Sequence, residues 1–163
     1  MKSYWQETIN KQKYSQLTEN IKTDVCIIGG GIAGILTAYM LTNSGLGVTI
    51  IEKNEMCMGV TANTTAKLTS QHGLFYSYLI NNFSKNFAKK YLVANENAIS
   101  LAKTIIEKEN IECDFEIQDA FVYTKVESEL PKIKEEVDAM ELLGFDAEFV
   151  EQIPLPFPVL RSY

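Results

Sequence analysis

The sequence has few of the residues that build metal centres and disulfide frameworks. It holds three cysteines and one histidine in 163 residues. The cysteines Cys26, Cys57 and Cys113 are widely spaced and form no Cys-x-x-Cys pair, a pattern that gives neither a zinc site nor a disulfide framework. We therefore expect no metal and three reduced thiols in a cytoplasmic protein. Cys26 lies within an apolar run, so we expect it to be buried.

The chain also lacks an excess of positive charge, a secretory signal and a convincing membrane span. Its net charge is −6, so no basic field is available to attract nucleic acid. The N-terminus has no apolar stretch of the kind that signal peptides carry. Residues 25–41 are mostly apolar, but a cluster of glycines within them favours a turn over a membrane-spanning helix. We expect no transmembrane segment.

What remains is the composition of a globular protein, 46% hydrophobic and 22% charged. After a polar N-terminal arm at 1–22, the pattern predicts a strand at 23–28, a helix at 32–43 and a strand at 48–52. The run from Val25 to Ile28 is continuously apolar, which is typical of a strand buried on both faces of a parallel sheet. Gly45 and Gly47 are suited to ending the helix.

Further elements follow a polar loop at 54–71. We expect helices at 74–82 and 87–109, with a core stripe on the second helix, and one or two strands within 114–124. A helix at 128–143 would be capped by Ser128, carry Pro131 in its first turn and end at Gly144. A strand at 147–150 and an extended proline-rich segment at 153–159 complete the prediction. The residues of the expected stripe are Ile99, Ala102, Ile105 and Ile106.

A glycine-rich motif follows the first strand and opens the first helix. Residues 29–34 match G-x-G-x-x-G, and Glu52 ends the next strand 23 positions after Gly29. Gly29 would allow a tight turn, Gly31 would let a pyrophosphate approach the backbone, and Gly34 would let helix and strand pack closely. The pattern predicts a dinucleotide site.

Each further part of this site has a predicted task. The N–H groups of Ile32 and Ala33, at the positive end of the helix dipole, would face the phosphates. Glu52 would accept hydrogen bonds from the two ribose hydroxyls of the adenosine and would repel a 2′-phosphate, which disfavours NADP. A turn of this kind that binds nothing is the alternative, and the motif itself leaves FAD and NAD both open.

The motif continues in a way that resembles a known flavoprotein family. Gly34 is followed by Ala38, Leu41 and Gly45, and the acid-bearing strand runs from Val48 to Lys53. This resembles the N-terminal FAD fingerprint of the glutathione-reductase superfamily. More narrowly, the chain resembles the D-amino-acid oxidase family, which includes glycine oxidase and gamma-glutamylputrescine oxidoreductase. The narrower resemblance depends on three features: an arm at 3–5, a fingerprint that is complete by Gly34, and a small-residue loop at 59–67.

The resemblance implies FAD as cofactor. It implies that the loop at 59–67 passes beside FAD, with Thr61, Thr64 and Thr65 as contacts; an ordinary polar loop is the alternative. Lys67 could lie near the flavin or be an ordinary solvated lysine. His72 could lie on the substrate side or be a packing histidine. The complete set of expected cofactor-binding residues is Gly29, Gly31, Ile32, Ala33, Gly34, Glu52, Lys53, Thr61, Thr64 and Thr65.

Residues 64–73 look most like a bacterial subgroup whose members often carry a C-terminal Rieske iron–sulfur domain. Such a cluster requires paired cysteine and histidine ligands, and this sequence has no such pairs. We therefore expect no iron–sulfur cluster within these 163 residues, and whether a Rieske domain follows in a longer product is open.

Together these patterns predict an α/β fold: a Rossmann-like FAD-binding βαβ unit with linking helices and the start of a mixed α+β substrate domain. We expect an arm at 1–22, an FAD-binding part at 23–110 and the beginning of a substrate domain at 111–163. By resemblance, the chain would be the truncated N-terminal portion of an oxidoreductase that oxidises an amine or amino-acid C–N bond, inactive by itself, with catalytic residues elsewhere. The alternative is a non-catalytic FAD- or NAD-binding module, completed by another chain or a homo-oligomer.

Overall fold

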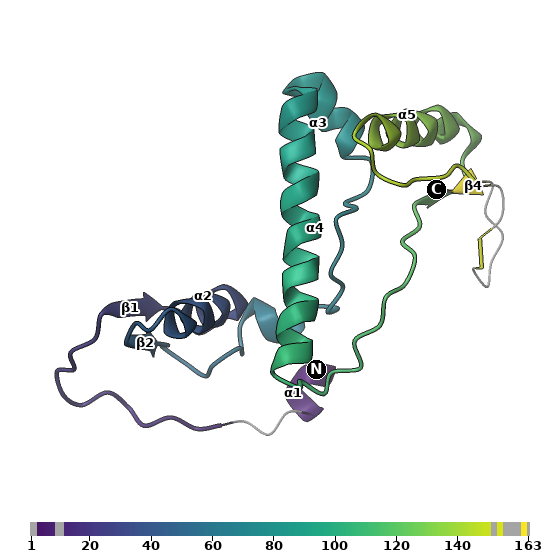
Figure 1. The fold of residues 1–163 in the computed structure, drawn as a ribbon. Coiled ribbons are helices and arrows are strands. Elements are labelled where there is room, and N and C mark those ends of the chain that lie inside the picture. The colour runs from purple at the N-terminus through teal and green to yellow at the C-terminus, as the bar shows by residue number, and fades with distance from the viewer. Residues whose placement is uncertain (1–2, 9–11, 151–152, 155–160, 163) are drawn as a thin grey trace. The chain divides into compact units, whose positions relative to one another are not determined.

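The computed structural model describes residues 3–8, 12–150, 153–154 and 161–162 (Figure 1). The chain divides into two compact units, Met1–Lys67 and Leu68–Tyr163. The proline-rich segment expected at 153–159 falls largely outside the described residues. In the described part, no helix is long and apolar enough to cross a membrane.

The first unit is built on a βαβ element. Strand β1 (Val25–Ile28) leads into helix α2 (Ile32–Asn43), and strand β2 (Val48–Ile51) follows. The two strands are parallel, with Val25 opposite Val48 and Ile28 opposite Ile51. Helix α2 has the bounds that the sequence pattern predicts, and Gly45, with φ of 85°, lies just beyond its end as a left-handed residue. The expected small parallel sheet is therefore present.

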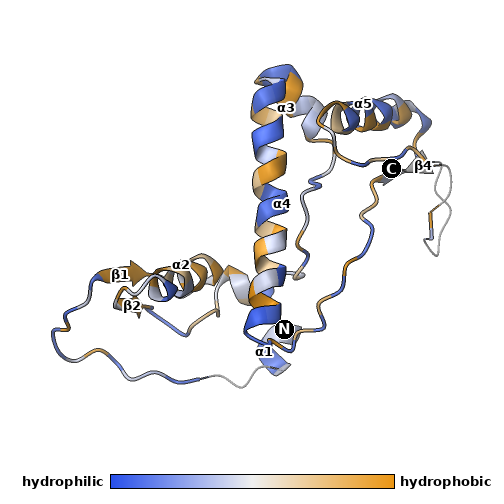
Figure 2. Cartoon of the chain, viewed as in Figure 1, coloured by the Kyte–Doolittle hydropathy of each residue, from blue (hydrophilic) through white to orange (hydrophobic). Residues whose placement is uncertain are grey.

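Helix α2 covers one face of this sheet and leaves the other open. The strands and much of α2 are apolar (Figure 2). Ile27 faces α2, whereas Cys26 and Ile28 point the opposite way, since alternate residues of a strand face opposite sides. Ile28 is 89% exposed and Cys26 is also exposed. The expectation of a strand buried on both faces, with Cys26 inside, is therefore wrong: two strands and one helix can cover only one side.

Two short helices belong to the same unit. Helix α1 (Tyr4–Thr8) forms within the N-terminal arm, and the 3₁₀ turn η1 (Val60–Asn63) forms in the small-residue loop. These two elements contact one another. Residues 12–24 between α1 and β1 form neither helix nor strand.

The second unit is mainly helical. It contains α3 (Tyr76–Asn82), α4 (Lys85–Lys108) and α5 (Leu130–Leu142), with a 3₁₀ turn η2 (Glu127–Glu129) before α5. The hydroxyl of Ser84 accepts a hydrogen bond from the N–H of Phe87 and so caps α4. A small antiparallel pair joins β3 (Tyr123–Thr124) to β4 (Arg161–Ser162).

The core of this unit lies where α3, the start of α4 and α5 meet. Its buried residues are Tyr76, Leu79, Ala88, Leu92, Ile133, Val137, Ala139, Met140 and Leu143. The stripe expected on α4 continues the same helix face, but its four residues are only half-buried. The first turns of α4 therefore carry the packing, because α3 and α5 lie against that end.

Three local expectations in this unit are wrong. The strands expected within 114–124 reduce to the two residues of β3, and 147–149 are irregular, with a single bridge at Val150. An alternating pattern forms a strand only where a neighbour supplies hydrogen-bond partners. Ser128 lies inside η2 and does not cap α5, which begins at Leu130 with Pro131 in its first turn.

Candidate nucleotide-binding site

The turn after β1 depends on glycine at its first position. Gly29 has φ of 105°, a left-handed conformation that side chains with a Cβ rarely adopt. Its N–H donates to the carbonyl oxygen of Ile51 at 2.8 Å, which extends the pairing between the two strands by one bond. The conformation sends the chain directly from β1 into α2.

Gly34 is required for a different reason: the structure has no room for a side chain at this position. A Cβ built on Gly34 would overlap the carbonyl oxygen of Gly29 and lie 3.4 Å from Cγ2 of Ile27. The backbone of α2 therefore packs directly on the end of β1. This is the close helix–strand approach that the third glycine of the motif predicts.

Gly31 is the one motif glycine that the protein's own packing does not explain. Its φ of −83° and ψ of −177° are open to any residue. A Cβ built there would meet only Oγ1 of Thr61, at 3.4 Å, which is an ordinary contact. Because glycine has no side chain, a ligand could approach the backbone closely at the start of α2.

The first turn of α2 presents backbone donors. The N–H of Ile32 donates to Oγ1 of Thr61 at 3.1 Å. The N–H groups of Gly31, Ala33 and Gly34 make no hydrogen bond within the described part of the chain. Unpaired N–H groups at the positive end of a helix form a binding site for an anion such as a diphosphate.

Glu52 follows β2 and its carboxylate turns back toward the glycine turn. Oε2 accepts from the N–H of Gly30 at 2.8 Å, and Oε1 accepts from the N–H of Asn54 at 2.9 Å. The Gly30 bond first, and then the Asn54 bond, hold the pKa of Glu52 below its ordinary value, because both favour the charged carboxylate. A carboxylate has about four acceptor positions, so capacity remains for the hydroxyls of a ribose.

The other expected residues of the first unit are exposed. Lys53 is exposed, and the hydroxyl of Thr64 accepts from the N–H of Ala66 at 3.1 Å. Thr65 and Lys67 are also exposed. His72 belongs to the second unit, where its ring lies 5.9 Å from that of Tyr91. Thus Gly29, Gly31, Ile32, Ala33, Gly34, Glu52 and Thr61 come together in the structure, and no hydrogen bond joins Lys53, Thr64 or Thr65 to the turn in the described part of the chain. Cofactor binding by all ten residues stays a prediction.

The structure adds two residues that the motif does not indicate. A Cβ on Gly30 would overlap the thioether end of Met56, so this side chain covers the turn. Cys57 adopts a φ of 61° and its N–H donates to the carbonyl oxygen of Gly30 at 2.8 Å. Burial raises the pKa of the Cys57 thiol. The only signal in the sequence is the apolar group Met56–Met58 within a polar loop.

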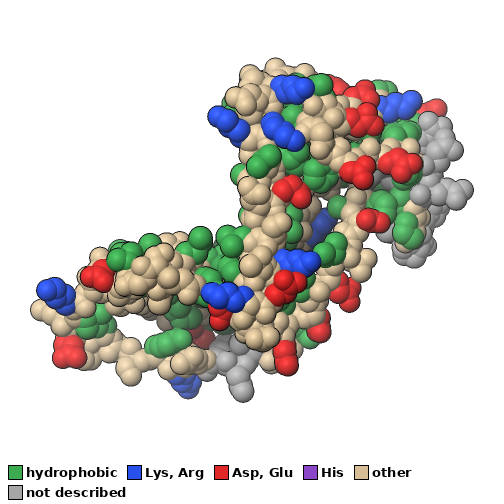
Figure 3. All heavy atoms as spheres, viewed as in Figure 1, with side chains coloured by type: hydrophobic (Ala, Val, Ile, Leu, Met, Phe, Trp, Pro, Cys, Tyr) green, Lys and Arg blue, Asp and Glu red, His purple; other side chains and the backbone are tan. Residues whose placement is uncertain are grey.

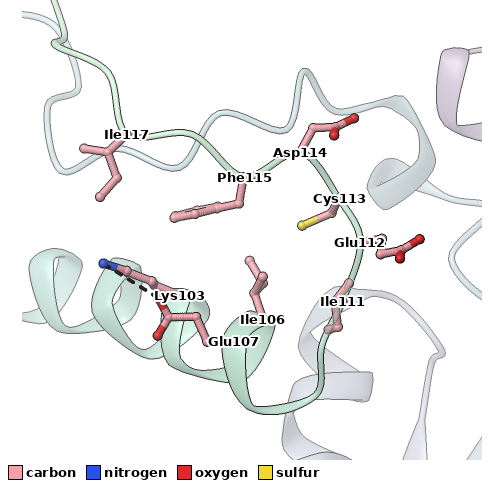
Figure 4. A pocket seen from close by; sticks show the side chains of 9 residues that line it. All are labelled: Lys103, Ile106, Glu107, Ile111, Glu112, Cys113, Asp114, Phe115 and Ile117. Carbon is pink, nitrogen blue, oxygen red and sulfur yellow. Dashed lines mark ion pairs between the residues drawn. The ribbon is translucent and has the colours of Figure 1, made fainter.

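A separate hollow of about 650 Å³ lies in the second unit, at the end of α4 (Figure 4). Ile106, Phe115 and Ile117 line it, and the ion pair between Lys103 and Glu107, 3.8 Å apart, lies at its edge. No set of polar groups converges on this hollow in Figure 4. In the described part of the chain, no three metal-ligating side chains come together either.

The face shown in Figure 3 carries side chains of both charges. On the face shown in Figure 3, acidic side chains gather over α5 and lysines gather near the start of α4, so neither sign dominates. The glycine turn therefore remains the site with the most specific chemistry.

The parallel βαβ unit, the glycine turn and the acid after β2 are features typical of dinucleotide-binding proteins. Comparison with known proteins specifies the family. The DAO family, described as FAD dependent oxidoreductase, matches residues 24–158, and the chain belongs to it. The cofactor of this family is FAD, as the resemblance implied.

The chain is also similar to individual proteins. It is 41% identical over 154 residues, 94% of its length, to YhfW of Bacillus subtilis (strain 168), which is named as a Rieske 2Fe-2S iron–sulfur protein. It is 22% identical over 143 residues, 87% of its length, to gamma-glutamylputrescine oxidoreductase of Escherichia coli (strain K12). A 49-residue match at 39% identity links it to the tRNA-modifying bifunctional protein MnmC of Psychrobacter cryohalolentis, covering 30% of this chain and 7% of that one.

The matched regions are only part of the relatives. The chain covers 30% of the length of the Bacillus protein and 33% of that of the Escherichia protein.

Proposed function

We propose that this chain binds the ADP half of FAD at the turn 29–34, as a Rossmann-like unit in the N-terminal portion of a flavin-dependent oxidoreductase. The observation that carries the proposal is Gly31, a glycine whose backbone angles and surroundings do not require one. A diphosphate bound close to the unpaired N–H groups of Gly31 and Ala33 would explain why position 31 has no side chain.

The residues of the turn have separate tasks in this proposal. The N–H groups at the start of α2 hold the diphosphate, and the hydroxyl of Thr61 donates to it while accepting from Ile32. The carboxylate of Glu52 accepts from the ribose hydroxyls, and its bond to Gly30 keeps it charged and oriented. These residues bind and orient; they do not perform the oxidation.

For the complete protein we propose oxidation of a C–N bond in an amine or amino acid. The support is the similarity to gamma-glutamylputrescine oxidoreductase, whose name denotes an amine substrate. Bound FAD supplies the acceptor for the hydride that leaves the substrate carbon. Loss of that hydride from carbon together with a proton from nitrogen would give an imine, which water would hydrolyse to a carbonyl compound and an amine or ammonia.

The experiment that tests the site is a titration with FAD, ADP and NAD. Gly31→Ala is the decisive variant, because the protein has room for the added methyl group and should fold normally. We expect FAD affinity to fall at least tenfold in this variant. Glu52→Ala should lose roughly 10- to 100-fold, the range expected when hydrogen bonds to a charged group are removed.

Matched controls are available within the same unit. Thr42→Ala changes an exposed residue at the far end of α2, and Glu19→Ala removes an exposed carboxylate from the arm. Both should leave FAD affinity unchanged. Unchanged affinity in Gly31→Ala and Glu52→Ala would show that the site is elsewhere.

The open face of the sheet favours a second candidate function, a non-catalytic FAD-binding module completed by another chain. Ile28 is 89% exposed there, which is unusual for an apolar strand residue. Turnover assays with amines separate the two candidates. The module predicts bound flavin without turnover in the isolated 163-residue chain and in the complete protein, whereas the oxidoreductase predicts turnover in the complete protein.

A further inference from the structure

A short N-terminal segment, residues 3–8, is fastened to the loop that carries Thr61. We call this segment, which includes α1, the α1 anchor. The indole N–H of Trp5 donates to the carbonyl oxygen of Thr64 at 2.8 Å, and the hydroxyl of Ser3 donates to the carbonyl oxygen of Ala62. Each bond joins residues 59 positions apart. The ring of Tyr4 lies edge-on to the indole, 5.1 Å between centroids, and supports it.

The two bonds hold the loop at Ala62 and Thr64, on either side of Asn63 in the sequence. A further bond attaches the loop to α2: Oγ1 of Thr61 accepts from the N–H of Ile32 at 3.1 Å. Ala62 next to it is 6% exposed, so the loop is packed at this point as well as hydrogen-bonded. Thr61 thus lies between two attachments, one to the start of α2 and one to the α1 anchor.

The position of Thr61 matters because its hydroxyl can accept one hydrogen bond and donate another. Its oxygen accepts from Ile32, which leaves the O–H free to donate to an anion beside Gly31. An alternative loop position would remove this donor and could also close the space beside Gly31, where Oγ1 lies at ordinary contact distance from a built Cβ.

We propose that the α1 anchor is part of the nucleotide site, with Trp5 and Ser3 as positioning residues that act through Thr61. The inference rests on the proposed function and adds a specific role for a segment outside the fingerprint. Its physical basis is preorganisation: the affinity of a ligand falls in proportion to the fraction of protein in the binding-competent state. Losing one anchor bond reduces that fraction.

A double-mutant cycle tests the proposal in the complete protein, with FAD binding followed by flavin fluorescence. Trp5→Phe keeps a ring but loses the N–H donor, and we expect FAD affinity to fall roughly 3- to 10-fold, as for one hydrogen bond. Ser3→Ala should act in the same direction. In a Thr61→Val background, Trp5→Phe should have no further effect, because the residue through which it acts is gone. Tyr14→Phe, an exposed aromatic elsewhere on the arm, should change nothing.

A second measurement is made on the 163-residue chain and uses the fact that Trp5 is its single tryptophan. If the anchor favours nucleotide binding, nucleotide must stabilise the anchor to the same extent. Saturating ADP, which has no flavin to absorb the emission, should reduce quenching of Trp5 fluorescence by acrylamide. The reduction should disappear in Thr61→Val. A purely structural anchor would give the same quenching with and without ADP.

The outcomes separate this inference from the proposed function. Wild-type affinity in Trp5→Phe, or equal losses from Trp5→Phe with and without the Thr61→Val substitution, would overturn the role of the anchor. ADP-independent quenching would do so as well. If Gly31→Ala still weakens FAD binding in those cases, the proposed function stands. If Gly31→Ala has no effect, the site assignment fails and the anchor's role fails with it.

Discussion

Oε2 of Glu52 lies 2.8 Å from the backbone nitrogen of Gly30, so the acid after the second strand is hydrogen-bonded to the turn after the first. This bond connects the glycine turn directly to the acid that follows β2, without a ligand between them. A carboxylate at this position therefore has two tasks, to support the turn and to present its remaining acceptor positions to a ribose. The first task can be measured without any ligand.

The pKa of Glu52 leads to a prediction about pH. Because the folded-state pKa is held below the ordinary value of 4.5, the stabilisation from this carboxylate is complete above pH 4.5 and is lost as pH falls through the lowered pKa. In NMR spectra, the amide resonance of Gly30 should titrate with a midpoint below 4.5. Glu52→Gln should abolish this titration. A midpoint at or above 4.5 would contradict the hydrogen bond.

Gly34 leads to a prediction about stability. Gly34→Ala places a methyl group against the carbonyl oxygen of Gly29, a backbone atom that can move only if α2 shifts away from β1. We expect a loss of about 3 kcal/mol in the free energy of unfolding, at the upper end of overpacking effects. Urea denaturation measures it. Thr42→Ala on the same helix is the control, and it should stay within about 0.5 kcal/mol of wild type.

The second unit contains a buried carboxylate that should be essential for its stability. Glu136 is fully buried, and it accepts hydrogen bonds from the N–H groups of Phe75, Tyr76 and Ser77 and from the Ser77 hydroxyl, at 2.6–2.9 Å. It thereby caps the start of α3 from a different helix. Removing it leaves buried donors unpaired.

We expect Glu136→Ala to destabilise the second unit by about 3 kcal/mol. Thermal and urea unfolding followed by circular dichroism would measure the loss. Glu135→Ala is the matched control, because the neighbouring carboxylate is exposed and accepts a hydrogen bond of 2.9 Å from the side-chain amide of Asn81. Equal stability of the two variants would show that the cap is unimportant.

Lys89 supports the other end of α5. Its ammonium group donates to the carbonyl oxygen of Leu143, where the negative end of the helix dipole favours a cation. Lys89→Met keeps most of the apolar stem and should lower the free energy of unfolding by about 1 kcal/mol. Lys90→Met, at the exposed neighbouring position, should have almost no effect. The difference between these two variants is the quantity to measure.

The elements that the sequence predicts well are those whose signals are local. The bounds of α2 follow from the glycines on both sides of it, and β2 ends one residue before the predicted end. The tasks of Gly29 and Gly34 follow from the motif spacing and agree with the backbone angle and the packing. The motif assigns Glu52 to the same expected site as the turn, although it does not predict the bond to Gly30.

The features that the sequence does not predict depend on partners far along the chain. The residues that Glu136 caps lie about 60 positions earlier, and nothing near residue 136 indicates them. The alternating pattern at 114–124 has no local means of selecting a neighbouring strand, so only Tyr123–Thr124 pair. The bond from Trp5 to Thr64 is of the same kind, since a polar arm gives no indication of where it attaches.

Cys26 allows chemical labelling of the uncovered face of the two-stranded sheet. Its thiol lies on the same side as Ile28, turned away from α2, and both side chains are exposed. A maleimide or disulfide reagent should therefore modify Cys26 readily in this chain, and any surface that settles over the strands would slow that modification. The rate of alkylation at Cys26, separated by peptide mass spectrometry from that at the exposed Cys113, thus reports whether this side of the sheet is bare or shielded.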